Sequence, residues 1–170
     1  MQDQPADTPR SGGLGDTRSG LAQQLNYIGG AYRVLHGKRV KSSGSPQVID
    51  HLVIGPNGIF HISVNPASGE IRLDGPGSAT EDSAGADLTA PLYRHEFVLK
   101  ELLREHKLRA DVVGIVCFTN PDSRLVGTAK AFVALGADRV VSHIQNHRPT
   151  RTLSPADVAS IEQLILENSE

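Results

Sequence analysis

Two apolar runs separated by Gly55-Pro56-Asn57-Gly58 constrain the fold of this chain more than any other stretch. Proline presets φ in a tight turn and glycine adopts positive φ without steric cost, so these four residues predict a turn. The flanking runs, residues 48–54 and 58–64, have the length and the β-branched content of strands. We therefore expect an antiparallel hairpin.

Polar side chains interrupt both predicted strands. Because side chains in a strand alternate between its two faces, Ser63 and Asn65 are expected on one face, together with His61. On the first strand, Asp50 is expected to share its face with three apolar residues, Val48, Leu52 and Ile54. An acid on such a face lies at the open end of the strand or has a chemical role.

Three short motifs in and after the hairpin resemble the nuclease-related domain (NERD) family. They are Ile-Asp-His at residues 49–51, Gly-Pro-Asn-Gly-Ile-Phe at residues 55–60 and Ser-Gly-Glu-Ile at residues 68–71. The resemblance extends over about residues 15–168. It implies a place in the restriction-endonuclease-like superfamily, and therefore an α/β fold with a mixed central sheet flanked by helices.

The same resemblance implies catalytic positions at which this chain departs from the family. The family carries an acid, one residue and a lysine on the strand after the turn, and Ser63 and Asn65 stand at those two positions here. The family glutamine in the next helix is Arg94, whereas Asp50 is retained. Metal-assisted hydrolysis of a phosphodiester needs at least two hard oxygen ligands and a group that activates water. We therefore interpret Asp50, Ser63 and Asn65 as inactive motif positions with no bound metal.

Three functions remain open at this point. The first is a catalytically degenerate nuclease domain that binds DNA or a protein partner without cutting. The second is a weak nuclease, with Mg²⁺ as its cofactor, whose site has migrated to Asp50, Asp16 and Glu70. The third is a structural or regulatory protein-interaction domain, which an exposed apolar patch at the sheet edge would favour.

The charge balance is unlike that of a domain that grips the DNA backbone over its whole surface. The chain has 17 Lys and Arg against 19 Asp and Glu, a formal net charge of −2. Any contact with DNA must therefore come from a local patch. The densest basic run is Lys38, Arg39 and Lys41, which we expect in a loop that leads to Asp50.

Length and composition favour one domain. The chain of 170 residues is 38% hydrophobic, which suits a single domain at residues 15–170 after a disordered leader at residues 1–14. The one cysteine, Cys117, lies in an apolar strand-like run, so no disulfide forms and a reducing, cytoplasmic location is favoured. No window contains the ~18 apolar residues of a membrane span.

Hydrophobic periodicity and capping residues predict the other elements. We expect strands at residues 32–35, 70–73, 112–118 and 131–135, a loop at 75–87, and helices at 17–28, 91–107, 138–146 and from Pro155 onward. The last helix is the best marked, because Ser154 and Asp157 form a capping-box pattern around Pro155.

Histidines offer two rival sites. Asp50, His61 and Ser63 suggest a Ser-His-Asp relay, but no nucleophile elbow accompanies the serine. His143 and His147 are four residues apart on a predicted helix and are interpreted as a surface pair rather than metal ligands. For His51, which follows Asp50 and points to the opposite face, a core role and a site role stay equally open.

Overall fold

A computed structural model describes residues 14–74, 90–129 and 132–170 of the chain, with side chains from residue 20 onward. The predicted loop at residues 75–87 and the predicted leader lie outside the described residues, except for Leu14, at which the first helix begins.

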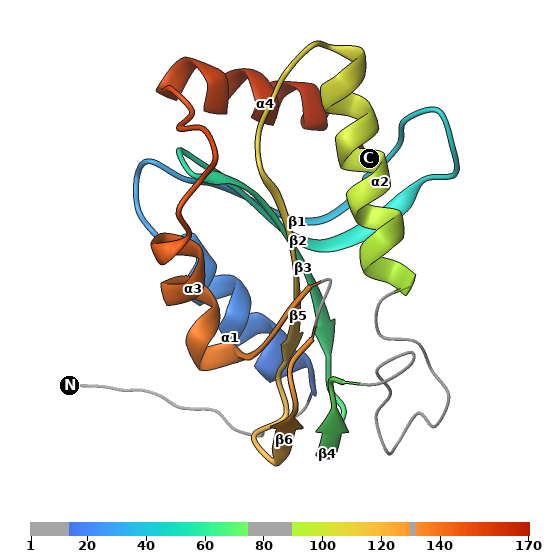
Figure 1. The fold of residues 1–170 in the computed structure, drawn as a ribbon, viewed down its shortest axis with the longest axis vertical. Coiled ribbons are helices and arrows are strands. Elements are labelled where there is room, and N and C mark those ends of the chain that lie inside the picture. Colours follow the sequence, from blue (N-terminus) through green and yellow to red (C-terminus); the bar gives the residue numbers. More distant parts are fainter. Residues whose placement is uncertain (1–13, 75–89, 130–131) are drawn as a thin grey trace, which may run out of the picture.

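The elements follow each other in a mixed α/β order (Figure 1). They are α1 (Leu14–Asn26), β1 (Arg33–Val40), β2 (Gln47–Gly55), β3 (Gly58–Asn65), β4 (Gly69–Arg72), α2 (Ala90–Glu105), β5 (Val112–Phe118), β6 (Ser123–Val126), β7 (Val133–Gly136), the 3-10 turn η1 (Ala137–Arg139), α3 (Val140–Asn146) and α4 (Pro155–Glu167). No helix in these described ranges is long and apolar enough to cross a membrane.

The central sheet is mixed, which confirms the predicted fold class. Its five strands have the order β1-β2-β3-β5-β7. The β1–β2 and β2–β3 pairs are antiparallel, whereas β3–β5 and β5–β7 are parallel. The return from β3 to the parallel strand β5 passes through α2, as a crossover connection requires.

Helices cover both faces of this sheet. On one face α2 and α4 pack against β1, β2 and β3, with Leu52 and Ile59 in that core. On the other face α1 and α3 pack against the sheet around Phe60 and Ile115. Because β2 and β3 are covered on both sides, every residue from His51 to Gly55 is buried.

A second, two-stranded sheet of β4 and β6 extends the molecule beyond the central sheet (Figure 1). It encloses a smaller core that includes Ile71 and Phe118. The sequence did not predict β6. Its four residues pair in parallel with β4, which lies about fifty residues earlier in the chain, so no local pattern marks them.

The pairing of β1 with β2 skips Gly37 and Asp50. Gly37 has φ of 58°, a left-handed conformation that interrupts the regular alternation of side chains. As a result Val48 is 54% exposed and Ile49 is completely buried. The expectation that Val48 shares the buried face of Leu52 is therefore wrong.

The turn Gly55-Pro56-Asn57-Gly58 forms hydrogen bonds with two later segments, the end of α3 and the chain before α4. The buried Asn57 side chain donates from Nδ2 to the Ile144 carbonyl at 2.6 Å and to the His147 carbonyl at 3.2 Å. The Pro56 carbonyl accepts the Leu153 N–H at 2.7 Å. We call this part of the hairpin the turn end, and the part around Asp50 the open end.

The last helix has the predicted cap. The Ser154 side chain accepts the Asp157 N–H at 3.0 Å, and the Asp157 carboxylate accepts the Ser154 N–H at 3.1 Å. Pro155 occupies the first turn, where its missing N–H costs no hydrogen bond.

Candidate functional site

Asp50 lies where β2 and β3 separate. The last residue pair of this ladder is His51 with Ile62. Beyond it the Asp50 carboxylate accepts the backbone N–H of Val64 at 2.9 Å, so a side chain replaces the missing strand-to-strand bond. Asp50 is therefore half-buried and already has a structural hydrogen bond at the open end.

Ser63 and Asn65 follow on β3. Ser63 lies between Ile62, the last residue of β3 that pairs with β2, and Val64, whose N–H bonds to Asp50, and it is half-buried. The Asn65 side chain accepts the Ala67 N–H at 2.9 Å, which fixes the turn that leaves β3. At residue 65, where the resemblance implies a lysine, the chain thus has an amide that stabilises its own backbone.

His61 is completely buried between β3 and α2. Its Nε2 lies 3.3 Å from the Glu96 carboxylate, which also forms an ion pair with Lys100 at 2.9 Å. The hydrogen bond from His61 is the main reason that the pKa of Glu96 lies below its ordinary value. Because His61 bonds to Glu96 and not to Ser63, the Ser-His-Asp relay is absent.

Gly114 on β5 makes room for the buried imidazole. It pairs with His61 across the β3–β5 ladder, and a Cβ at this position would lie 2.8 Å from Cε1 of the ring. The His61 Nδ1 atom has no hydrogen-bond partner among the described residues. The sequence signal for this arrangement is a glycine within an otherwise apolar strand.

His95 was missed by the sequence reasoning, although it follows Arg94 directly. It is 6% exposed and its ring meets the His61 ring edge to face, with the centroids 6.1 Å apart. The pKa of His95 falls from 6.5 to about 4, mainly because of burial and then because of the neighbouring His61 and Arg94, against the opposing effect of the Asp50 carboxylate. His95 is therefore neutral at physiological pH.

Among the described side chains, those around Asp50 do not fit a Mg²⁺ ion. Glu96 is held by His61 and Lys100, and Glu70 lies on β4, where it forms ion pairs of 3.8 Å with Arg72 and Arg124. Asp16 lies on α1, but its side chain is outside the described part. Within the described ranges no three His, Cys, Asp or Glu side chains are placed to hold a metal ion.

The other histidines have structural contacts. On the opposite face of β2, His51 bonds to His36 through their Nδ1 atoms at 2.9 Å, and His36 Nε2 lies 2.9 Å from the Asn26 side chain. This favours the core role for His51. His147 lies just beyond α3 rather than within it, and its Nε2 lies 3.0 Å from Asp111, so it does not form a helical pair with His143.

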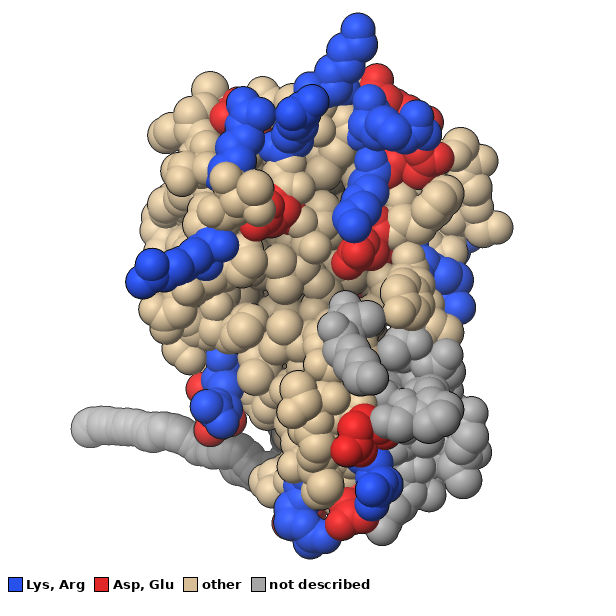
Figure 2. Space-filling view, viewed as in Figure 1, with Lys and Arg blue, Asp and Glu red and all other residues tan. Residues whose placement is uncertain are grey.

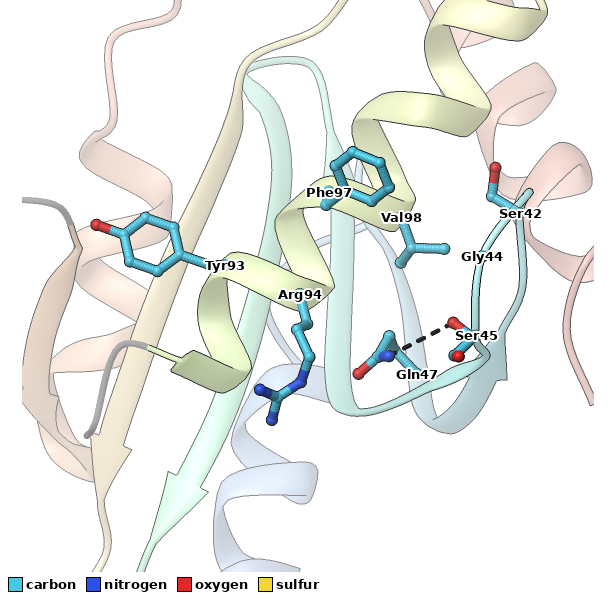
Figure 3. A pocket seen from close by; sticks show the side chains of 8 residues that line it. All are labelled: Ser42, Gly44, Ser45, Gln47, Tyr93, Arg94, Phe97 and Val98. Atoms are coloured by element: carbon cyan, nitrogen blue, oxygen red, sulfur yellow. Dashed lines mark hydrogen bonds between the residues drawn. The ribbon is translucent and has the colours of Figure 1, made fainter. Parts of the chain in front are cut away.

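A groove of about 240 Å³ lies between α2 and the β1–β2 connection (Figure 3). Arg94, at the family glutamine position, extends beside it, and Gln47 and Ser45 lie on the facing segment. Two exposed aromatic residues of α2, Tyr93 and Phe97, belong to its lining and are 58% and 60% exposed.

The predicted basic loop is a strand. Lys38 and Arg39 lie within β1, opposite Ile49 and Val48, and Lys41 follows it. Consecutive residues of a strand point to opposite faces, so Lys38 and Arg39 are directed apart. The sequence predicted a loop here, yet β1 continues to pair with β2 beyond Gly37, as far as Val40. Basic side chains that are adjacent in the sequence therefore lie on different faces of the strand.

The mixed sheet and the motif-bearing hairpin define a nuclease-like α/β domain. The family model of the nuclease-related domain (NERD) matches residues 17–119, more than half of the 170 residues, so the chain belongs to this family. The match ends at residue 119, before β6, β7, α3 and α4, and is therefore shorter than the predicted resemblance. No curated protein and no solved structure matches the chain.

The Asp50 bond generates a stability prediction. In Asp50→Ala the Val64 N–H loses its acceptor, so the free energy of unfolding should fall by about 1–2 kcal/mol. In Asp50→Asn an amide oxygen can still accept this bond, and the change should stay below about 0.5 kcal/mol. Urea unfolding of both variants at pH 7 measures this. An Asn variant as unstable as the Ala variant would contradict the assigned role.

His95 generates a pH prediction. Since its pKa is about 4 when folded and 6.5 ordinarily, the unfolded chain binds more protons between these values. Stability due to neutral His95 is therefore present above pH 6.5 and is lost as the pH falls toward 4, by about 2 kcal/mol between pH 7 and pH 5. His95→Gln should remove this part of the pH dependence in urea unfolding. His106→Gln, at an exposed histidine, is the control and should keep it.

Proposed function

We propose that this chain is a nuclease-related domain that has lost metal-dependent cleavage and acts as a DNA-associated binding module. The observation that carries the proposal is the state of the open end. At the motif positions that the resemblance implies, Asp50 is retained and accepts the Val64 N–H. The neutral residues Ser63 and Asn65 stand in place of the acid and the lysine.

Three chemical reasons support the loss of cleavage. A single carboxylate holds Mg²⁺ poorly, and Ser63 supplies at best a neutral oxygen. No lysine stands at residue 65 to orient water. The carboxylates of Glu96 and Glu70 already have cationic or hydrogen-bonding partners. On this proposal the chain works without a cofactor.

The proposed partner is DNA, because the family is nuclease-related and the motif-bearing hairpin is retained. A cytoplasmic location is part of the proposal and is supported by Cys117, which is buried and forms no disulfide.

A protein-interaction module is the second candidate function. It is favoured by the groove beside α2, where Tyr93 and Phe97 are exposed next to Arg94. Contiguous exposed apolar surface of this kind is typical of sites for protein partners. Failure of the chain to bind a DNA duplex would leave this candidate as the better one.

Cleavage is tested directly. The purified chain should leave linear and supercoiled DNA intact with Mg²⁺ or Mn²⁺, because no second free carboxylate accompanies Asp50 among the described side chains. Gel electrophoresis of the DNA measures this over several hours. Cleavage that disappears in Asp50→Ala but persists in Asp122→Ala, a change of an exposed acid elsewhere, would refute the proposal.

Restoring the family residues should create a metal site. Ser63→Glu with Asn65→Lys adds a carboxylate next to Val64, whose N–H bonds to Asp50, and a cation on the same strand. We expect calorimetric titration with Mn²⁺ to give binding heat for this variant and none for the parent. Ser63→Gln with Asn65→Lys keeps the size of the new side chains without the acid and should give none. Absence of heat in both variants would mean that β3 no longer has the family's geometry here.

A further inference from the structure

Four exposed cations gather at the turn end of the hairpin although they are far apart in the sequence. Lys107 and Arg109 lie in the connection between α2 and β5, and Arg148 and Arg151 lie in the connection between α3 and α4. Figure 2 shows basic side chains over the end of the molecule where the α2–β5 connection and α4 lie in Figure 1.

One carboxylate holds these two connections together. Asp111, two residues after Arg109, accepts the Thr150 N–H at 3.0 Å, and its Oδ2 lies 3.0 Å from His147 Nε2. Thr150 and His147 are the sequence neighbours of Arg151 and Arg148. Each of the three arginines therefore lies within two residues of Asp111 or of a residue that bonds to the Asp111 side chain.

The hairpin turn also forms hydrogen bonds with both connections. The Asp111 carbonyl accepts the Ile59 N–H at 2.8 Å, and Asn57 donates to the His147 carbonyl at 3.2 Å. Both connections are thus bonded to the turn end as well as to each other. The cations are attached to a rigid base rather than to free loops, which lowers the entropy cost of binding.

The four cations are not neutralised locally. None of them forms an ion pair with a described residue, whereas Arg33, Arg72, Lys100, Arg104 and Arg124 each have an acidic partner. Burial raises the pKa of Asp111, but the hydrogen bonds from Thr150 and His147 outweigh this effect and leave the pKa below its ordinary value. The four positive charges therefore lack an ion-pair partner among the described residues, in a chain with a net charge of −2.

Lys107 has an additional feature. Its φ is 57°, in the left-handed region where glycine is usual, at the end of α2. The bonds from Lys107 N–H to the Arg104 carbonyl and from Leu108 N–H to the Leu103 carbonyl complete a Schellman cap. A lysine at this position keeps a cation where glycine would fit the backbone better.

We propose that Lys107, Arg109, Arg148 and Arg151 form a basic surface that binds the phosphate backbone of duplex DNA, at the turn end of the hairpin and not beside Asp50. The proposal rests on the proposed function and names the surface that serves it. Half of this basic surface lies outside the part of the chain that matches the family, residues 17–119.

Phosphate binding by a duplex fits better than binding to an anionic membrane. Peripheral membrane binding needs apolar side chains that enter the interface as well as cations. The exposed large hydrophobic residues of the described chain are Tyr27, Val48, Tyr93, Phe97 and Leu166, and none lies in the two connections. Guanidinium groups, by contrast, match phosphate geometry with two parallel hydrogen bonds.

The test uses the full chain and a fluorescein-labelled DNA duplex of mixed sequence, followed by fluorescence anisotropy over a series of salt concentrations. Each neutralised phosphate contributes ~0.9 to the slope of log affinity against log salt, so four contacts give a slope of about −3.6. Affinity should fall roughly 150-fold between about 50 and 200 mM salt.

Two triple variants with the same loss of charge locate the surface. Arg109→Ala, Arg148→Ala and Arg151→Ala together should weaken binding at least about tenfold and flatten the slope by about 2.7. Lys38→Ala, Arg39→Ala and Lys41→Ala together should leave both quantities close to those of the parent. Thermal unfolding of both variants serves as the control for folding.

Lys107→Gly separates binding from stability. Glycine fits the left-handed position, so the melting temperature should stay the same or rise. The affinity for the duplex should nevertheless fall, with the slope flatter by about 0.9. A purely structural role for Lys107 would not produce this combination.

The outcomes are distinct. Loss of binding in the arginine variant, with retention in the Lys38, Arg39 and Lys41 variant, supports the basic surface. Binding that survives in the arginine variant overturns the basic surface but leaves DNA association intact. Failure of the parent to bind the duplex overturns both, and sedimentation with phosphatidylserine vesicles would then identify a membrane as the partner of these cations.

Discussion

The buried amide of Asn57 is the contact on which the arrangement of the molecule depends. It joins the tip of the β2–β3 hairpin to the end of α3, and the adjacent Pro56 carbonyl joins the same tip to the chain before α4. Glycine is required on both sides, since a Cβ at Gly55 would lie 2.3 Å from the Tyr32 ring and one at Gly58 would lie 2.9 Å from the Asp111 carbonyl. A motif that reads as a simple turn is therefore also a tertiary contact.

The open end of the same hairpin has a different character. There the strands separate, and polar side chains replace strand pairing: Asp50 receives the Val64 N–H, and Asn65 receives the Ala67 N–H. Behind them His61 of β3 and His95 of α2 are both buried, and His61 bonds to Glu96. The Asp50 and Asn65 side chains thus stabilise the backbone at the open end.

Charge is distributed by the fold in a way that composition does not reveal. In the densest basic run, Lys38 and Arg39 lie on the extended strand β1, which directs neighbouring side chains to opposite faces, and Lys41 follows the strand. Lys107, Arg109, Arg148 and Arg151 are spread over more than forty residues and meet because Asp111 bonds to His147 and Thr150. Patches must therefore be judged from the contacts between loops and not from runs of like charge.

The sequence by itself determined the features that depend on local spacing. The hairpin, the β5 strand, the cap of α4 and the mixed α/β class all follow from turn residues, apolar periodicity and motif residues close together in the chain. Only the tertiary structure decided the pairing of β6 with β4 and the interruption of the β1–β2 ladder at Gly37 and Asp50. It also decided the burial of His61 and His95 and the contact between the α2–β5 and α3–α4 connections. These features join residues that are distant in sequence, and backbone geometry and long-range contacts leave no periodic signal in the chain.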